Sequence, residues 1–234
     1  MPAADLRVAI VGCGGIADAY AEAVARVAGA MLTDVVDPDP RRRAIVAERM
    51  NATPHEGLAT LCNLDAALLL TPPNTHEALA TEMLDRGAHV LCEKPLAPTV
   101  DAADRMLAAA AAADRRLMMG SKFRYTPDVS AARALLDARC CGDVVLYENV
   151  FCSHVDMSDR WNSRPEISGG GVLIDNGCHS VDLARYLLGP LSRVQAQFGR
   201  RVQDLPVEDT ARMLFQSHSG ALGSIDLSWS VHKQ

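Results

Sequence analysis

The sequence has 234 residues, of which 49% are hydrophobic, 22% charged and 4% aromatic. This length is enough to bury one large core or two smaller ones, and the charge content is that of a globular protein. The formal net charge of -6 argues against a broad basic surface for binding nucleic acid. No run of about 18 apolar residues occurs, so the sequence predicts no membrane span.

Seven cysteines are scattered along the chain, and none belongs to a CxxC pair. Cys140 and Cys141 are adjacent, which is an unfavourable spacing for a disulfide between them. The N-terminus lacks the pattern of a signal peptide, because glycines interrupt the first apolar run. We therefore expect reduced thiols in a cytoplasmic protein. No metal site is expected, because no two Cys/His pairs stand at metal-ligand spacing.

The first half of the chain alternates between strand patterns and helical patterns. Short apolar runs predict strands at residues 7–11, 31–36, 66–70, 89–92 and 117–119. Apolar residues at helical spacing predict helices at residues 16–28, 40–50, 75–86 and 99–114. Asp39 is expected to cap the second helix, with Pro40 in its first turn. This alternation predicts an α/β domain over residues 1–120, a doubly wound parallel sheet of the Rossmann type with functional loops at the carboxyl ends of the strands.

The pattern changes after about residue 120. Helices are predicted at residues 126–138 and near 178–188. Strand-like runs occur at residues 144–153, 193–198, 211–215 and 221–229. Strands with few intervening helices are typical of a mainly antiparallel sheet. We therefore expect residues 121–234 to form a second domain of the α+β class.

A glycine-rich segment, residues 12–17, follows the first predicted strand and opens the first predicted helix. It fits GxGxx[GA], in which Gly12 permits a tight turn and Gly14 lets a pyrophosphate approach the backbone. The start of the helix adds free N–H groups and the positive end of the helix dipole. The residues expected to contact a dinucleotide are Gly12, Gly14, Gly15 and Ile16. A plain tight turn is the alternative interpretation of this segment.

Asp37 ends the second predicted strand, 25 positions after Gly12. A carboxylate at this place typically accepts hydrogen bonds from the adenosine ribose of a dinucleotide. The alternative is a loop carboxylate that caps the next helix. A carboxylate also repels a 2′-phosphate, so Asp37 favours NAD over NADP. Arg41 and Arg42 are close enough in sequence to neutralise such a phosphate, and NADP therefore stays possible.

Three more motifs follow in order: Thr71–His76 (TPPNTH), Glu93-Lys94-Pro95, and the run GGGVLIDNGCHSVD at residues 169–182. Together with the glycine-rich segment, they resemble the glucose–fructose oxidoreductase / inositol dehydrogenase (Gfo/Idh/MocA) family over nearly the whole chain. The resemblance implies a first domain that binds a nicotinamide dinucleotide and a second domain that forms the substrate face. It also implies an NAD(P)-dependent dehydrogenase that transfers hydride between a sugar or polyol carbon and the nicotinamide.

The resemblance assigns the catalytic cluster to Lys94, Asp175 and His179. Alcohol oxidation releases a proton with the hydride, and an imidazole titrates near neutrality. A neutral Lys94 is a candidate base or relay, whereas a charged Lys94 stabilises an alkoxide. Asp175, His179 and Asp182 share one helix face if the helix already includes Asp175, and Asp182 is expected to be structural. The alternatives are a solvated lysine and a histidine satisfied within the core.

Further residues are expected around the cofactor and the substrate. The turn after the third predicted strand predicts contacts with the nicotinamide half, or else caps of the next helix, for Thr71, Pro72, Asn74 and His76. Glu93 and Lys94 are also expected to contact the cofactor. On the substrate side, the residues expected beside the catalytic cluster are Arg124, Trp161 and Arg164. Packing and a surface ion pair are the alternative for Trp161 and Arg164.

The second domain of the family normally continues past the end of this sequence, so the resemblance predicts an incomplete second domain. An open sheet edge invites pairing with another subunit, and we expect a homo-oligomer. Two other functions remain open. One is a regulatory or scaffold protein that binds NAD(P) without turnover. The other is an enzyme whose transient oxidation enables elimination or glycoside cleavage and returns NAD unchanged.

Overall fold

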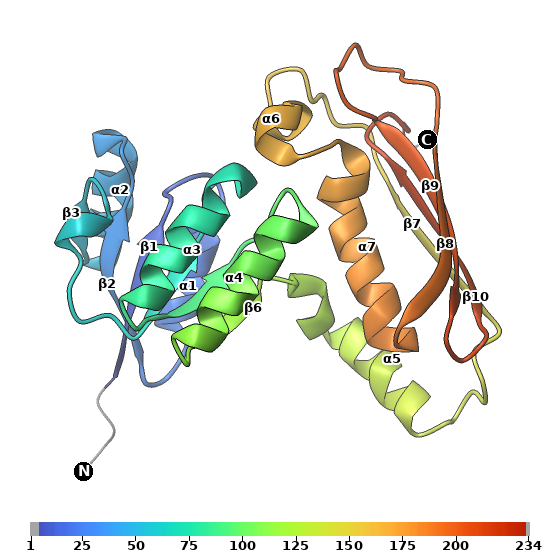
Figure 1. Ribbon diagram of the computed structural model, residues 1–234, viewed down its shortest axis with the longest axis horizontal. Helices are drawn as coiled ribbons and strands as arrows, with labels where there is room; N and C mark the ends of the chain where they lie inside the picture. The colour runs from blue at the N-terminus through green and yellow to red at the C-terminus, as the bar shows by residue number, and fades with distance from the viewer. Residues whose placement is uncertain (1–4, 233–234) are drawn as a thin grey trace. The chain divides into compact units, whose positions relative to one another are not determined.

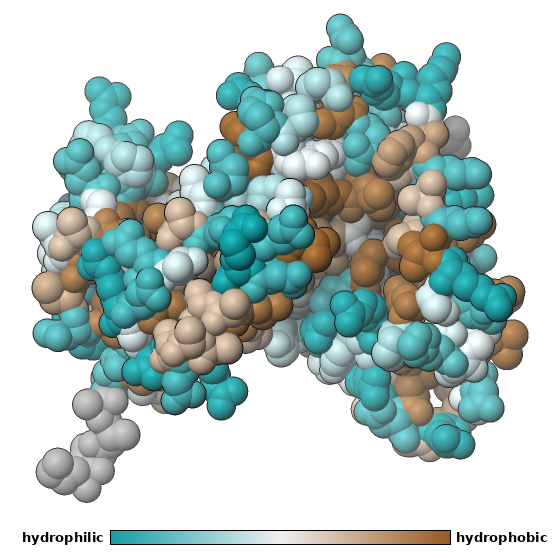
Figure 2. Space-filling view, in the orientation of Figure 1, coloured by the Kyte–Doolittle hydropathy of each residue, from teal (hydrophilic) through white to brown (hydrophobic). Residues whose placement is uncertain are grey.

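The structure, a computed structural model, describes residues 5–232 (Figure 1). The chain divides into two compact units, with the boundary after Gly120. Figure 2 shows hydrophilic side chains over much of the visible surface of both units. Within the described residues, no helix is both long enough and apolar enough to cross a membrane.

The first unit contains a parallel sheet with the strand order β3-β2-β1-β4-β5-β6. Its strands are β1 (Leu6–Val11), β2 (Ala30–Val36), β3 (Thr53–His55), β4 (Ala66–Leu69), β5 (His89–Cys92) and β6 (Leu117–Met119). The order reverses between β1 and β4, and doubly wound sheets bind ligands at the carboxyl ends of the strands at such a reversal. The predicted doubly wound sheet is confirmed. The sequence analysis missed β3, because three residues at the sheet edge carry no strand pattern.

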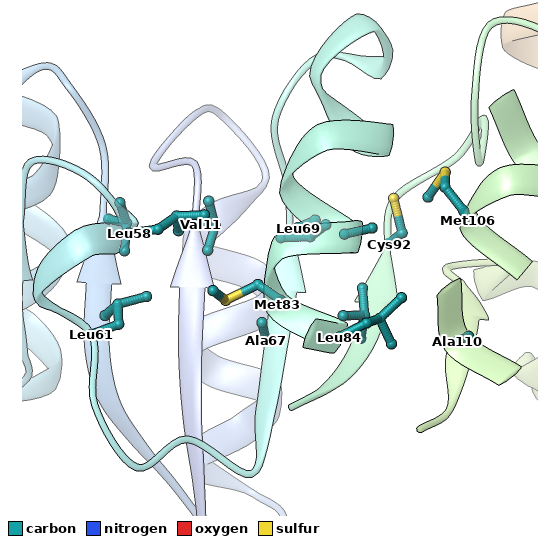
Figure 3. Packing of buried hydrophobic residues seen from close by; sticks show 13 residues of the cluster. Val11, Leu58, Leu61, Ala67, Leu69, Met83, Leu84, Cys92, Met106 and Ala110 are labelled. Carbon is teal, nitrogen blue, oxygen red and sulfur yellow. The ribbon is translucent and has the colours of Figure 1, made fainter. Parts of the chain in front are cut away.

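Helices cover both faces of this sheet. They are α1 (Ala17–Ala25), α2 (Pro40–Met50), α3 (His76–Asp85) and α4 (Val100–Ala112). One core includes Ile10, Ala21 and Val46 and lies between the sheet and α1 and α2. The other core lies against α3 and α4, where Figure 3 shows Leu69 with Met83 and Met106 among the packed side chains. Burial on both faces explains why the strands read as continuous apolar runs.

The predicted start of α2 is confirmed. Asp39 Oδ1 accepts hydrogen bonds from the backbone N–H of Arg41 at 2.8 Å and of Arg42 at 3.4 Å. Pro40 occupies the first turn, where its missing N–H leaves no hydrogen bond unmade. These two backbone N–H groups lower the pKa of Asp39. The cap holds α2 directly after the end of β2, where Asp37 lies.

The second unit contains a mixed sheet with the strand order β7-β10-β9-β8. Its strands are β7 (Leu146–Cys152), β8 (Leu191–Phe198), β9 (Thr210–Ser217) and β10 (Leu222–Ser228). The β9 strand pairs antiparallel with both neighbours, while β7 and β10 are parallel. The long helix α7 (Val172–Leu188) packs on β9 and β10 (Figure 1). The shorter helices of this unit are α5 (Pro127–Asp137) and α6 (Pro165–Ser168).

Helix α7 begins at Val172, earlier than the start predicted near residue 178. Gly177 therefore lies inside the helix. A Cβ on Gly177 would lie 3.1 Å from Leu227 Cδ1 and 3.3 Å from Leu173 Cδ1. The missing side chain at Gly177 therefore lets Leu227 of β10 pack closely against the middle of α7. The longer helix places Asp175 in its first turn.

The outer face of the second sheet, away from the core, exposes several apolar side chains. The strand residues with exposed apolar side chains there are Leu146, Val150, Leu214 and Leu222. An ion pair between Arg212 and Asp226 lies among them, with Arg212 Nε 2.5 Å from Asp226 Oδ1. The inward residues of β9 alternate with these and are buried, as Met213 and Phe215 show. The alternation identifies one core face and one half-apolar exposed face.

Candidate functional site

The glycine-rich segment forms the predicted turn between β1 and α1. Gly12 has φ +100°, and a Cβ there would lie 2.9 Å from Thr71 Cγ2. Only glycine fits this backbone conformation and this contact without strain. Gly14 and Gly15 are exposed, and a Cβ on either would meet nothing within 4 Å. Helix α1 has no side-chain cap, and the exposed glycines before it form an open surface of the kind that binds phosphates.

Asp37 lies at the end of β2 and is only 7% exposed. Its Oδ2 accepts a hydrogen bond from the Cys13 N–H, and its Oδ1 accepts one from the Asp39 N–H, both at 2.8 Å. The carboxylate thereby ties the glycine turn to the end of β2. A carboxylate oxygen accepts two hydrogen bonds, so these contacts leave room for a ribose hydroxyl.

The arginines that begin α2 differ in their contacts. Arg43 Nη1 donates to the backbone carbonyls of Asp37 and Pro38, both at 3.1 Å. Arg42 instead lies beside Asp39, with Nε 3.5 Å from Oδ2. The sequence analysis named Arg41 and Arg42 and missed Arg43. Helical spacing was the available signal, because Arg43 lies one turn beyond the cap residue.

The Cys13 thiol sits inside the glycine turn. It is buried, and its Sγ lies 3.9 Å from the carbonyl oxygen of Val36. Burial is the main reason that the pKa of Cys13 rises to about 11, and the Asp37 carboxylate raises it further. A thiol with so high a pKa stays protonated near neutral pH and is a poor nucleophile. Cys13 therefore belongs to the packing of the turn.

The loop after β4 holds the predicted Thr71–His76 motif at the same edge of the sheet. His76 is fully buried, with Nδ1 3.0 Å from the Pro95 carbonyl oxygen and Nε2 2.8 Å from the Thr71 carbonyl oxygen. The imidazole thus links the loop after β4 to the loop after β5. Thr75 Oγ1 donates to the Pro72 carbonyl at 2.8 Å. Asn74 is exposed beside them.

Glu93 and Lys94 follow β5. The Glu93 N–H donates to the Leu69 carbonyl at 2.9 Å and extends the pairing with β4 by one residue. The Glu93 carboxylate is buried, with Oε1 accepting from the Tyr20 hydroxyl at 2.6 Å and Oε2 from the Lys94 N–H at 2.9 Å. Lys94 is half-buried, and the Lys94–Pro95 peptide is cis.

Tyr20 was not among the residues predicted from the sequence. It lies on α1 three residues after the buried Ala17, and its side chain is half-buried. That spacing indicated a core-facing position. The sequence did not show that the hydroxyl meets Glu93, a residue 73 positions away.

In the second unit, Asp175, His179 and Asp182 lie along one face of α7. His179 is 8% exposed, and its ring packs edge-on against Phe123 with 4.7 Å between the ring centroids. Asp182 accepts two hydrogen bonds from Arg124, at 2.7 Å from Nε and 2.5 Å from Nη2. The structural role predicted for Asp182 is confirmed, and the Arg124 guanidinium is engaged in that pair.

Asp175 has a polar neighbour that sequence reasoning missed. Its Oδ1 accepts a hydrogen bond from Asn162 Nδ2 at 3.1 Å. Asn162 lies in the short 3₁₀ turn Trp161–Ser163, so the half-buried Trp161 is its direct neighbour. Arg164 is exposed and precedes α6. The segment before the glycine run therefore contacts the first turn of α7.

The second glycine run, residues 169–171, is covered by a carboxylate of the chain itself. The Gly171 N–H donates to the Glu208 carboxylate at 3.1 Å, and the Leu173 N–H donates to Glu208 Oε1 at 3.0 Å. A Cβ on Gly171 would lie 2.1 Å from the Glu208 carbonyl oxygen. Gly169 adopts a left-handed conformation that ends α6. These glycines serve packing and capping.

Across residues 5–232, no group of three or more His, Cys, Asp or Glu side chains is arranged to hold a metal ion. Within the same residues, none of the seven cysteines forms a disulfide. The polar groups gathered at the carboxyl edge of the first sheet come instead from the loops after β1, β2, β4 and β5. Open amides beside a carboxylate fit the pyrophosphate and ribose of a dinucleotide.

Comparisons with known proteins agree with this geometry. Residues 6–121 match the family model described as an oxidoreductase family with an NAD-binding Rossmann fold, and residues 129–234 match the GFO/IDH/MocA C-terminal domain. The chain is 30% identical to inositol 2-dehydrogenase 4 of Saccharopolyspora erythraea over 232 residues, covering 95% of this chain and 67% of that protein. It is 32% identical to inositol 2-dehydrogenase of Rubrobacter xylanophilus over 231 residues, covering 94% and 64%.

Solved structures agree as well. The WlbA dehydrogenase of Chromobacterium violaceum, in complex with NADH and UDP-GlcNAcA, has a TM-score of 0.92 at 27% identity, covering 100% of this chain and 70% of that chain. The chain therefore spans about two thirds of the length of the relatives it matches. These matches confirm the predicted resemblance, the NAD-binding Rossmann fold and the class of oxidoreductase.

Proposed function

This chain belongs to the Gfo/Idh/MocA oxidoreductase family, and we propose that it transfers a hydride between a hydroxyl-bearing carbon of a sugar or polyol and the nicotinamide of NAD. The observation that carries the proposal is the open turn before α1, with uncapped amides, Gly12 at φ +100° and Asp37 beside it. The inositol dehydrogenases and the NADH-bound WlbA dehydrogenase support the same class of reaction.

We assign the dinucleotide to the carboxyl edge of the first sheet. The amides of residues 14–16 would hold the pyrophosphate above the tight turn at Gly12, and Asp37 would accept from the adenosine ribose. The loops after β4 and β5 would meet the nicotinamide half through Thr71, Pro72 and Asn74. When bound, NAD supplies the carbon that accepts the hydride. His76 and Glu93 serve this edge by holding the loops, because their polar atoms contact the protein itself.

The residues of this chain must take the proton that leaves the alcohol. We propose Lys94 and His179 as the groups that exchange this proton. A neutral amine at Lys94 would accept the proton, and a charged amine there would stabilise the alkoxide. Asp175, held by Asn162, would orient the imidazole or a substrate hydroxyl.

Three further residues complete the substrate side of the proposal. Trp161 and Arg164 would contact the sugar or polyol directly. Arg124 would act through Asp182, because both nitrogens of its guanidinium fork already donate to that carboxylate. A bidentate pair of this kind holds a short segment firmly on a helix.

We propose NAD as the preferred cofactor. The Asp37 carboxylate is nearly buried at the place where a 2′-phosphate would lie, and desolvation strengthens the repulsion between the two anions. Calorimetry should therefore show tighter binding of NADH than of NADPH. Asp37→Ser should narrow the difference, since it removes the negative charge and leaves Arg43 nearby. Equal affinities in the unmodified protein would contradict this preference.

The proposed setting is the cytoplasm, where free thiols persist. We further propose a homo-oligomer that buries the apolar outer face of the second sheet, because contiguous exposed apolar surface marks an interaction site. No nucleic acid or membrane partner is proposed. Analytical ultracentrifugation at micromolar concentration tests the oligomer, and a monomer would contradict it.

The test of the reaction is NADH formation with a panel of polyols and sugars that includes myo-inositol, apiose and levoglucosan. Lys94→Ala should lower kcat at least about 100-fold while the Kd for NADH changes little, because the amine serves the proton transfer. Arg26→Ala, which removes a positive charge from the exposed end of α1, is the matched control.

The outcomes separate the alternatives. Unchanged turnover in Lys94→Ala would contradict its catalytic role. Tight NADH binding without turnover of any compound would favour the regulatory or scaffold protein. Conversion of a glycoside without net NADH formation would favour transient oxidation with recycling of NAD.

A further inference from the structure

The backbone on both sides of Lys94 is anchored by residues from two different helices. Tyr20 of α1 reaches it through Glu93, and His76 of α3 reaches it through Pro95. We propose that Tyr20 and His76 are positioning residues that fix the direction in which Lys94 leaves the carboxyl edge of the sheet. This inference rests on the proposed function, because it concerns the residue to which the proton transfer is assigned.

The first anchor is a chain of two hydrogen bonds. The Tyr20 hydroxyl donates to Glu93 Oε1 at 2.6 Å, and Glu93 Oε2 accepts from the Lys94 N–H at 2.9 Å. Burial, and then the bond to Glu93, raise the pKa of Tyr20, so the phenol remains the donor. Tyr20 thereby holds the carboxylate in the rotamer that binds the Lys94 amide.

The space around this chain is closed by a third element. A Cβ on Gly120 would lie 2.8 Å from Tyr20 Oη and 3.5 Å from Glu93 Oε1. The Gly120 N–H donates to the Cys92 carbonyl at 2.8 Å, which keeps this glycine beside the end of β5. The hydroxyl and the carboxylate therefore have little freedom to move apart.

The second anchor lies after Lys94. His76 Nδ1 is 3.0 Å from the carbonyl oxygen of Pro95 and 3.2 Å from that of Leu96, while Nε2 is 2.8 Å from the Thr71 carbonyl oxygen. Because His76 is fully buried, these contacts are shielded from water. The ring holds the loop after β5 at a set distance from the loop after β4.

The two anchors constrain the backbone from which the Lys94 side chain leaves. Glu93 holds the Lys94 amide, and His76 holds the Pro95 carbonyl that follows. The helices α1 and α3, which carry Tyr20 and His76, are packed on the sheet and serve as rigid supports. A group that transfers a proton must be held to within a fraction of an ångström, and loosening its support lowers the rate without removing the group.

The lysine content of the chain permits a direct test. Only three lysines occur, at positions 94, 122 and 233, so protein labelled with ¹⁵N-lysine gives three backbone amide signals. Loss of one signal in Lys94→Arg identifies the amide of residue 94. In Tyr20→Phe, the hydrogen exchange of that amide should speed up about tenfold, as expected for the loss of one buried hydrogen bond. The Lys122 amide serves as the internal reference.

The kinetic readout uses whichever polyol of the panel gives NADH with the unmodified protein. Tyr20→Phe should lower kcat about tenfold and change KM for NAD less than about twofold, because the group remains and only its support is loosened. His76→Gln, which alters the anchor after Lys94, should likewise speed up the hydrogen exchange of the Lys94 amide and lower kcat. Tyr125→Phe, which alters an exposed tyrosine, should change neither.

The inference is overturned if both variants keep the Lys94 exchange rate and kcat of the unmodified protein. It is also overturned if they lower only the melting temperature, since that is the result of a purely structural role. If no polyol yields NADH with the unmodified protein, the proposed function fails. The exchange measurement still decides whether Tyr20 and His76 hold the backbone of Lys94.

Discussion

The glycine turn before α1 and the glycine run before α7 look alike in sequence and differ in what covers them. In the first, Gly14 and Gly15 are exposed, and a Cβ on Gly14 would meet nothing within 4 Å. In the glycine run before α7, the Glu208 carboxylate accepts hydrogen bonds from the N–H groups of Gly171 and Leu173. Both helix starts offer the same positive dipole end and free donors. The chain itself supplies the anion in the second unit, and we propose that a ligand supplies it in the first.

This difference separates the proposed dinucleotide site from a structural cap. The open turn is connected to Asp37 through the Cys13 amide, so its shape is set before a ligand arrives. The covered run instead sets where α7 begins and which residues its first turn presents, including Asp175. A glycine motif by itself therefore indicates that another group approaches the backbone closely. The neighbouring elements decide whether that group is a ligand or a side chain of the protein.

The largest effect is expected for Gly171→Ala. The new Cβ would lie 2.1 Å from the Glu208 carbonyl oxygen, so the start of α7 or the segment before β9 must move. We expect a loss of about 3 kcal/mol in the free energy of unfolding, measured by urea denaturation. NADH binding by the first unit should be nearly unchanged. A stability within about 0.5 kcal/mol of the unmodified protein would contradict the covered turn.

Gly14→Ala is the opposite case. Nothing in the protein lies within 4 Å of the new Cβ, so the melting temperature should hold. The methyl group would instead occupy the space into which a pyrophosphate approaches, and the Kd for NADH should rise about 100-fold. Gly57→Ala, at another glycine with open space around it, is the control. Undiminished NADH affinity in Gly14→Ala would argue against the dinucleotide site.

Glu208→Ala converts the covered turn into an open one. The two amides at the start of α7 lose their acceptor, which should cost about 1–2 kcal/mol of stability. Added sulfate should then raise the melting temperature of this variant more than that of the unmodified protein, because the anion replaces the carboxylate. Glu166→Ala, which removes an exposed carboxylate from α6, should show no such gain. If sulfate raised the melting temperature of Glu208→Ala and of the unmodified protein equally, Glu208 would not be the anion that covers the start of α7.

The smallest effect concerns the thiol in the open turn. Burial and Asp37 raise the pKa of Cys13 from 9.0 to about 11. The folded state therefore favours the neutral thiol, and this stabilisation is complete below about pH 9 and is lost as the pH rises toward about 11. Cys13→Ala should show a shallower loss of stability over this range, by on the order of 1 kcal/mol. Cys62→Ala, at an exposed thiol, should follow the unmodified protein.

Local patterns predicted most of the fold because they report burial directly. Continuous apolar runs indicated the central strands, and Asp39 with Pro40 indicated the start of α2. The strand β3 was not predicted, because a three-residue strand at the edge of a sheet has no clear apolar pattern. The start of α7 was predicted too late in the chain, because a glycine at position 177 is unfavourable in an isolated helix, whereas here it packs against Leu227 of β10.

The sequence by itself determined the order of strands and helices, the glycine turn and the family motifs, since these depend on backbone freedom and on the spacing of apolar residues. Tertiary structure decided which polar groups meet. Tyr20 reaches Glu93, Arg124 reaches Asp182 and Glu208 reaches α7 only after the sheets assemble. Hydrogen bonds between residues distant in sequence have no local signature, because the partner is chosen by the packing that brings the two elements together.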